Sequence, residues 1–424
     1  YLADNLVGDG LEHALLGIPD PGQCYWIFRS DPQCPKLILV PNYFIGRTRE
    51  IERINRAIVQ TSGGKNENLF ITGERGIGKS SLAVITRYIA EEKYQFVRAH
   101  CYVGAARNIS DVCRIVLTKM LQAMPDKGLF DKARDVVGKY IKGIQLGVFG
   151  VGMNVEFTDN QKLLEDLPLN FLSIIRGIFE TIKEDKTGLL LILDDLNGMS
   201  NVPEFSYFLT SFVDEIASSQ KLLPILLILV GIPDRMSDLA KNQPSISRIF
   251  NVIELNSMNN NESEEFFKKA FESADITIEQ DALPILTRYS GGLPVLLHEV
   301  GDAVYWEDSD SCINRDDAIK GIFHAAETVG RKYLDRQVCQ TLRSETYHSI
   351  LRRMGKLPLE AKFRRKELVK EMNESERRNF DNFRRRMEEL GVLAKEEVRG
   401  EYRFSNELFR LYVMIEALIA EERG

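Results

Sequence analysis

The amino-acid sequence predicts an α/β protein with a parallel sheet covered by helices on both faces, then a helical domain, then three helices and a hairpin. Apolar segments of strand length alternate with amphipathic helices between residues 69 and 230, which is typical of a parallel sheet between two helical layers. Strand patterns stop after Glu254, and an alternating pattern returns only near the C-terminus.

Composition limits the class of protein. The chain has 424 residues, of which 44% are hydrophobic and 28% charged, so we expect two to four globular domains rather than a fibrous or disordered chain. No apolar run reaches eighteen residues, which excludes a membrane span. Six cysteines lie scattered without a CxxC pair. Together with the lack of a leader pattern after Tyr1, they predict a cytoplasmic protein with reduced thiols.

The predicted order of elements begins with an irregular segment, residues 1–41, which contains five prolines. A core over residues 42–255 follows. Its helices are expected at Glu50–Val59, Ser80–Glu92, Ile109–Met124, Leu169–Glu184 and Phe205–Ser218, and its strands at Leu69–Thr72, Tyr94–Cys101, Leu189–Leu193 and Pro224–Val230. Residues 144–157 alternate around Gly150, which predicts a hairpin. We expect it to extend the core sheet, although an inserted loop that touches a partner is the alternative.

Two further domains are predicted. Residues 256–338 read as helices only, at Glu262–Ser273, Ile278–Ser290, Pro294–Trp306 and Arg315–Asp335. In residues 339–424, two helices precede a third at Glu376–Glu389, and Val392–Leu393 with Val398–Phe404 form a hairpin. Three helices and a hairpin are typical of a winged helix-turn-helix.

A glycine-rich loop joins the strand Leu69–Thr72 to the next helix. Its residues Gly73, Glu74, Arg75, Gly76, Ile77, Gly78, Lys79 and Ser80 fit the pattern GxxxxGK[ST], with Ser81 following. Glycines let backbone N–H groups curl round a phosphate, the lysine reaches the β- and γ-phosphates, and the hydroxyl of Ser80 ligates Mg²⁺. Because a strand precedes the loop and a helix follows it, we predict a site for ATP and Mg²⁺ in a P-loop NTPase sheet.

The second half of such a site is an acidic residue at the end of another apolar strand. Leu189–Leu193 is followed by Asp194 and Asp195. We predict that Asp194 holds Mg²⁺ through water and that Asp195 polarises the attacking water. For Asp195 the alternative is that it only caps the next helix.

With these motifs the chain resembles the AAA+ and STAND branch of P-loop ATPases, and within it the archaeal-type ATPases related to replication initiators and transposition ATPases. Phe44, Ile45, Gly46 and Arg47 are similar to the motif that packs beside the adenine. The segment Ser247–Phe250 is similar to the one that carries the arginine finger, here Arg248. Gly291, Gly292, Leu293 and Pro294 resemble the GxP element of a helical lid, whose proline approaches the adenine.

The chain departs from the family pattern at three places. Asp195 stands where AAA+ enzymes usually have Glu, Gly231 stands at the sensor 1 position, and no sensor 2 arginine follows the lid glycines, where His298 is the nearest polar residue. The resemblance with these departures implies a slow, switch-like ATPase. Arg248 either reaches the γ-phosphate of a neighbouring subunit, which requires a homo-oligomer, or pairs with a surface carboxylate, which contributes under about 1 kcal/mol.

The C-terminal part carries the positive charge. Residues 352–386 hold 13 basic and 6 acidic residues, whereas the whole chain has a net charge of −7. The arginines of Glu376–Glu389 are expected to point outward toward DNA, with Arg364, Arg365, Lys366 and the wing-tip Arg399 in support; these arginines are Arg377, Arg378, Arg384, Arg385 and Arg386. The leading hypothesis is an ATP-dependent switch that acts on DNA in replication, transposition or defence. The alternative is a signalling scaffold whose ATP-dependent assembly is triggered by a ligand or protein, with a protein-docking winged helix.

Overall fold

The computed structural model describes residues 45–422 apart from 125, 141–147, 150–151, 154–165, 220, 333–344, 357–361, 397 and 399. The expected N-terminal segment, Phe44 and Arg399 lie outside the described residues. The chain divides into two compact units. One is Arg47–Asn256, and the other contains Ile45 and Gly46 together with the described residues from Ser257 onward. Within the described part of the chain, no helix is long and apolar enough to cross a membrane.

The unit Arg47–Asn256 is built on a five-stranded sheet in the order β2-β5-β6-β1-β7, in which all neighbouring strands are parallel. This confirms the predicted sheet. The strands are β1 Glu67–Gly73, β2 Phe96–Tyr102, β5 Gly188–Asp194, β6 Ile225–Gly231 and β7 Asn251–Leu255. Strands β5 and β6 are buried at every position, because helices cover both faces of a parallel sheet.

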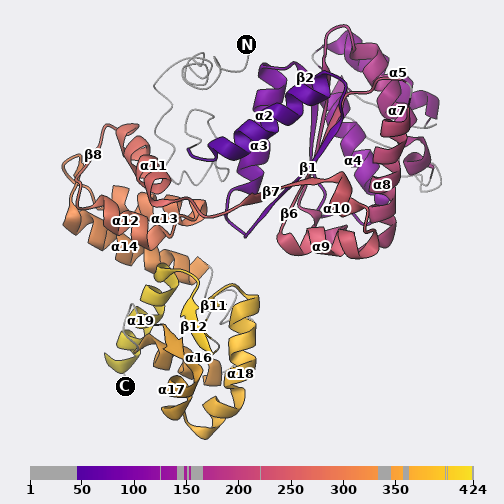
Figure 1. Cartoon of the computed structure of the whole chain (residues 1–424). Helices are drawn as coiled ribbons and strands as arrows, with labels where there is room; N and C mark the ends of the chain where they lie inside the picture. Colours follow the sequence, from indigo (N-terminus) through magenta and orange to yellow (C-terminus); the bar gives the residue numbers. More distant parts are fainter. Residues whose placement is uncertain are drawn as a thin grey trace. The chain divides into compact units, whose positions relative to one another are not determined.

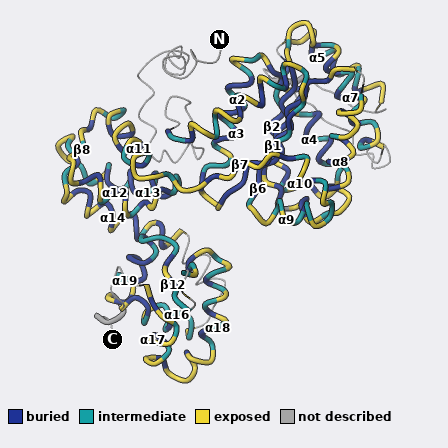
Figure 2. Tube along the Cα trace, viewed as in Figure 1, coloured by how far each residue is buried: buried dark blue, intermediate teal, exposed yellow. Residues whose placement is uncertain are grey.

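Helices α2 (Thr48–Ser62) and α3 (Lys79–Glu92) cover one face of this sheet, and α4 (Ile109–Gln122), α7 (Leu167–Ile182) and α8 (Pro203–Ser218) cover the other (Figure 1). The second face holds a large apolar core that contains alternate residues of β2 and β5. The remaining alternate residues, including His100 and Asp194, therefore face α3. The buried strands stand out between exposed helix surfaces (Figure 2).

The sequence did not predict the edge strand β7 or the helices α5 (Lys127–Tyr140), α9 (Pro233–Asn242) and α10 (Ile246–Ile249). The hairpin over residues 144–157 is described only at β3 Val148–Phe149 and β4 Gly152–Met153. These strands pair with each other in a two-stranded sheet of their own, so the expectation that the hairpin extends the core sheet was wrong. Alternating hydrophobicity predicts a strand but does not specify its partner.

The second unit begins with four helices around one apolar core. They are α11 Asn260–Glu272, α12 Leu283–Ser290, α13 Pro294–Tyr305 and α14 Arg315–Val329. Capping boxes at Asn259 and Asn314 start α11 and α14, as the residue types favour. Contrary to expectation, strands do not stop after Glu254, because β8 (Thr277–Ile278) pairs in parallel with β9 (Cys312–Ile313).

The C-terminal part of this unit contains α16 Glu345–Gly355, β10 Phe363–Arg364, α17 Arg365–Lys370, α18 Glu374–Glu389, β11 Leu393–Lys395, β12 Glu401–Phe404 and α19 Glu407–Glu422. The three strands form an antiparallel sheet in the order β10-β12-β11. Helix α19 contributes to two cores. Its Leu408 and Leu411 belong to the core of α11–α14, whereas Tyr412 and Val413 belong to the core of α16–α18 and the sheet.

Candidate nucleotide site and basic helix

The glycine-rich loop connects β1 directly to α3, and its glycines adopt a backbone that other residues avoid. Gly73, Gly76 and Gly78 have φ of 148°, 79° and 94°. A Cβ at Gly73 would lie 2.6 Å from the carbonyl oxygen of Leu255. Gly78 precedes the first turn of α3, where no side chain caps the helix. The unpaired N–H groups of that turn, together with the helix dipole, suit an anion.

Lys79 lies across this loop. Its Nζ donates to the carbonyl oxygens of Gly73 at 3.0 Å and Glu74 at 2.7 Å. Burial lowers the pKa of Lys79, nearby Arg75 lowers it further, and the charge of Asp194 opposes this shift. The structure therefore brings together the lysine and the first aspartate, which lie more than a hundred residues apart in the sequence. Ser80 lies exposed at the start of α3, and Ser81 follows it half-buried.

Asp194 ends β5 with its carboxylate almost completely buried. Oδ1 accepts a hydrogen bond of 2.8 Å from the backbone N–H of Asp195, and Oδ2 lies 3.3 Å from Nε2 of His100. Sequence patterns did not indicate His100 as part of the site. The structure places it in the site because it lies two residues before the end of β2, the strand beside β5, on the face that α3 covers.

Asp195 adopts a left-handed backbone with φ 61° and ψ 63°. It precedes the short 3-10 helix η3 (Leu196–Gly198) but makes no side-chain cap hydrogen bond to it, which removes the observation that would favour a capping role. Its Oδ2 lies so close to Gly104 that a Cβ there would be 2.2 Å from it. Glycine at this position therefore leaves room for the carboxylate. Strain of this kind often accumulates at functional sites.

Arg47 fixes the position of α2 against the phosphate loop. It is buried, with φ 62°, and donates to the carbonyl oxygen of Ile77 at 3.2 Å. Gly46 and Ile45 belong to the other compact unit, where Ile45 enters the core of α11–α14 and a Cβ at Gly46 would lie 2.9 Å from Glu262. The motif therefore straddles the point where one unit ends and the other begins.

Three other residues singled out from the sequence lie on different elements. Arg248, on α10, is exposed, and no carboxylate in the described part of the chain pairs with it. Pro294 is the first residue of α13. The two glycines before it have structural reasons. Gly291 ends α12 with a left-handed backbone of φ 58°, and a Cβ at Gly292, which has φ 70°, would meet the Met258 carbonyl at 2.1 Å. Gly231 ends β6, the strand between β5 and β1.

His298 lies one turn after Pro294 on α13. Its ring meets that of Phe266 edge-on at 5.0 Å, and its Nδ1 is buried without a hydrogen-bond partner among the described residues. Burial lowers the pKa of His298 to about 4. The side chain is therefore uncharged at neutral pH, so it cannot supply the positive charge of a sensor 2 arginine.

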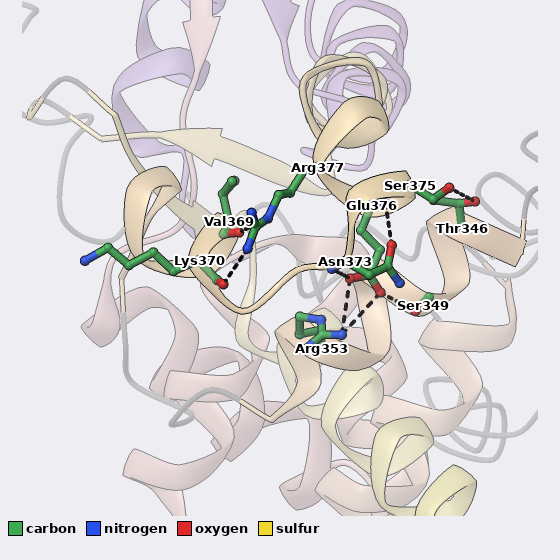
Figure 3. A network of polar contacts seen from close by, with 9 residues as sticks. All are labelled: Thr346, Ser349, Arg353, Val369, Lys370, Asn373, Ser375, Glu376 and Arg377. Atoms are coloured by element: carbon green, nitrogen blue, oxygen red, sulfur yellow. Dashed lines mark hydrogen bonds and ion pairs between the residues drawn. The ribbon is translucent and has the colours of Figure 1, made fainter.

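A second candidate surface is α18, which ion pairs and hydrogen bonds hold in place. The buried Glu376 accepts hydrogen bonds from the backbone of Asn373 and from Ser349, and it pairs with Arg353 on α16 at 3.2 Å (Figure 3). Arg377 donates to the carbonyl oxygens of Val369 and Lys370 at the end of α17. These contacts lock the turn between α17 and α18, so the buried half of this network is structural.

The expected outward row of arginines on α18 is only partly present. Arg384 is half-buried, pairs with Glu388 and lies 5.2 Å from the ring centre of Tyr402. Its expected outward orientation was wrong, because the side chain packs on the three-stranded sheet. Arg377 donates to carbonyl oxygens at the end of α17. Arg378 and Arg385, in contrast, are exposed on the same face of α18. The exposed polar stripe of α18 consists of Ser375, Arg378, Asn382 and Arg385.

Comparisons with known proteins agree with this geometry. Residues 43–228 match the family model of the AAA ATPase domain. The ORC2 protein of Aeropyrum pernix, solved in complexes with ADPNP and ADP, is 14% identical with a TM-score of 0.56; the match covers 94% of this chain and 98% of that one. The Walker-type ATPase PABY2304 of Pyrococcus abyssi is 13% identical with a TM-score of 0.50; that match covers 88% and 96%. No curated protein sequence matches the chain. The glycine-rich loop and the aspartates at the end of β5 lie within the matched residues, and this part of the chain is an ATPase domain of the AAA type.

Proposed function

We propose that this ATPase is a slow molecular switch that binds ATP with Mg²⁺ at the phosphate loop. We further propose that it acts on DNA through its C-terminal subdomain, the elements from α16 to α19. Lys79 contacts the β- and γ-phosphates, Ser80 and Asp194 hold the metal, the latter through water, and Asp195 orients the attacking water. The support for the nucleotide site is the left-handed glycine loop in front of the uncapped α3, with Lys79 close enough to Asp194 for their charges to interact.

The residues present fit Mg²⁺, which prefers oxygen ligands and keeps several waters. Ser80 offers an exposed hydroxyl, and Asp194 offers a carboxylate that the backbone N–H of Asp195 and His100 orient. When bound, the ion neutralises charge on the β- and γ-phosphates. Two features support the proposal of slow turnover: Gly231 has no side chain at the end of β6, and His298 is uncharged.

The proposed DNA contact rests on the stripe of α18. The order α16-β10-α17-α18-β11-β12 is the order of a winged helix, whose third helix enters the major groove. Arginine reads guanine edges and asparagine reads adenine there, and the stripe offers Arg378, Asn382 and Arg385 on one face. The exposed lysines Lys366 and Lys370 of α17 lie on the preceding helix and suit phosphate contacts.

A protein-docking role is the second candidate, and a specific observation favours it. Much of the basic surface is neutralised within the subdomain by ion pairs: Lys362 with Glu396, Arg364 with Glu401, Arg365 with Asp381 and Arg386 with Glu389. A polyanion gains less from arginines that already have carboxylate partners. In this case the subdomain binds a protein, and the ATPase is a signalling scaffold.

Salt dependence of duplex binding distinguishes the two functions. If α18 reads DNA, Arg378→Glu with Arg385→Glu should weaken duplex binding by orders of magnitude at low salt. Each lost phosphate contact should also reduce the slope of log affinity against log salt by about 0.9. The matched control is Lys268→Glu with Lys269→Glu, which changes the net charge equally on the exposed side of α11 and should leave binding unchanged. If the wild type shows no salt-sensitive binding to duplex or single-stranded DNA, with or without ATP, the protein-docking function is favoured.

A further inference from the structure

The buried carboxylate of Asp194 has one hydrogen-bond donor on each oxygen within the described part of the chain. The backbone N–H of Asp195 reaches Oδ1, and the ring of His100 reaches Oδ2. The side chains of His100 and Asp194 are 4% and 5% exposed. A carboxylate only accepts hydrogen bonds, so Nε2 of His100 carries the hydrogen in this contact.

Burial makes this contact important. An ionised carboxylate taken out of water is costly unless donors replace the lost water. A carboxylate with one donor on each oxygen also has a fixed rotamer, whereas a single donor would leave it free to turn about χ2. His100 thus determines how the lone pairs of Asp194 that remain free are directed.

The ring of His100 is itself held in place. Tyr102, two residues later on β2, stacks on it with ring centres 5.0 Å apart and planes inclined by 27°. Tyr102 is also the register partner of Asp194, so the three side chains lie on one face at the same end of β2 and β5. Tyr102 is largely exposed. It therefore orients the ring of His100 and adds little to the apolar core.

We propose that His100 is a positioning residue for the metal site: it donates Nε2–H to Oδ2 of Asp194 and fixes that carboxylate for the Mg²⁺ that accompanies ATP. The inference rests on the proposed metal role of Asp194. Partners that orient metal ligands in this way typically change metal affinity by about 10–100-fold when they are removed.

The test measures binding of a fluorescent ATP analogue as Mg²⁺ is titrated, and again in excess EDTA. His100→Leu, which keeps the volume and loses the donor, should raise the Mg²⁺ concentration for half-maximal effect by about tenfold or more. Metal-free binding of the analogue should not change. His100→Gln, which retains an N–H donor, should recover most of the loss. Tyr102→Leu changes an exposed side chain and should shift the Mg²⁺ requirement in the same direction by less.

Asp194→Asn separates failure of this inference from failure of the proposed site. If Asp194→Asn raises the Mg²⁺ requirement while His100→Leu and Tyr102→Leu do not, His100 has no positioning role and the site stands. If His100→Gln is as impaired as His100→Leu, the ring and not its donor matters, which also overturns the proposal. If Asp194→Asn has no effect on the Mg²⁺ requirement, the metal role of Asp194 fails and the inference fails with it. Should His100→Leu not fold, Tyr102→Leu with unchanged Mg²⁺ dependence would contradict the proposal.

Discussion

At the scale of single residues, the nucleotide site combines strained backbone with buried charge. Asp195 adopts a left-handed conformation that costs an ordinary residue of the order of 1–2 kcal/mol. Asn and Asp tolerate this region better than other residues that are not glycine. A change of Asp195 to Asn should therefore keep the turn and remove only the negative charge.

This reasoning gives the first prediction. Lys79→Ala should abolish ATP turnover and strongly weaken binding, because the positive charge on the β- and γ-phosphates is lost with the side chain. Asp195→Asn should bind ATP but hydrolyse it about a hundredfold more slowly or worse. Steady-state turnover and analogue binding measure both effects. Lys93→Ala, at the far end of α3, is the control and should behave as the wild type. Unchanged turnover in both site variants would disprove the assignment.

His298 gives a prediction about pH. Its pKa in the folded protein is about 4, against an ordinary value of 6.5, because of burial. The unfolded chain therefore binds more protons between these values, so folding stability is fully present above pH 6.5 and decreases as pH falls toward 4. Protonation of His298 should lower the free energy of unfolding by roughly 3 kcal/mol over this pH range. Burial also raises the pKa of Asp302 to about 6, and this group acts in the opposite direction, since its stabilisation is present at low pH and lost as pH rises through 6.

The contribution of His298 is isolated by comparing the wild type with His298→Leu in denaturant unfolding at pH 7.5 and pH 4.5. Asp302 is present in both proteins, so its effect cancels. From pH 7.5 to pH 4.5, the free energy of unfolding should fall by a few kcal/mol less in the variant than in the wild type. An equal pH dependence in the two proteins would show that His298 is not held uncharged.

Much of the site could be predicted from the sequence, but the role of His100 and the orientation of Arg384 could not. Lys79 and Asp194 were predicted because a loop of fixed spacing and an aspartate after an apolar strand are local signals. His100 was not, because its role depends on β2 and β5 being neighbours, and strand order is not written in any local pattern. Arg384 was predicted to face solvent from its helical position alone, whereas the ring of Tyr402 and the carboxylate of Glu388 hold it against the sheet.

At the scale of elements, the same contrast holds. The apolar strands β5 and β6 were found to within one residue, because parallel strands buried on both faces are continuously apolar. The edge strand β7 has only two buried positions, so the chain around it gave no such signal. The hairpin β3–β4 was found as a hairpin but assigned to the wrong sheet, since turn and alternation are local and sheet membership is not.

Helix α19 offers an element-scale prediction about packing. A Cβ at Gly355 in α16 would lie 2.5 Å from the carbonyl oxygen of Val413 and 2.7 Å from Cβ of Ala417. Backbone atoms cannot move away at low cost, so Gly355→Ala should lower the free energy of unfolding by about 1–3 kcal/mol. Thermal unfolding measures this change.

The matched control is Gly138→Ala in α5. That glycine is also helical, but a Cβ there would meet nothing within 4 Å. Removing glycine from a helix interior should stabilise the protein by about 0.5–1 kcal/mol. If the substitution lowers the free energy of unfolding at Gly355 and raises it at Gly138, the loss at Gly355 is due to its contact with α19. A stable Gly355→Ala variant would contradict the close packing.

At the scale of the whole molecule, the exposure of Arg248 allows a test of whether copies of the chain assemble. The chain has a net charge of −7, whereas Arg248 on α10 is exposed, without a carboxylate partner among the described residues. An arginine that reaches the phosphates of a neighbouring subunit needs this freedom, and a head-to-tail interface places one subunit's arginine at the next subunit's site.

If Arg248 acts in this way, Arg248→Ala should lower turnover and leave the affinity of the monomer for ATP unchanged, because the residue stabilises transferred charge on another subunit. Arg56→Ala, an exposed arginine of α2, should change neither. Mixing Arg248→Ala with Lys79→Ala should restore part of the activity, because the subunit with Lys79 binds ATP and the subunit with Arg248 supplies the guanidinium. Steady-state turnover of the mixture against each variant alone measures this complementation, and sedimentation with ATP measures assembly. A protein that remains monomeric with ATP at every concentration, or a mixture no more active than its parts, would show that Arg248 does not act between subunits.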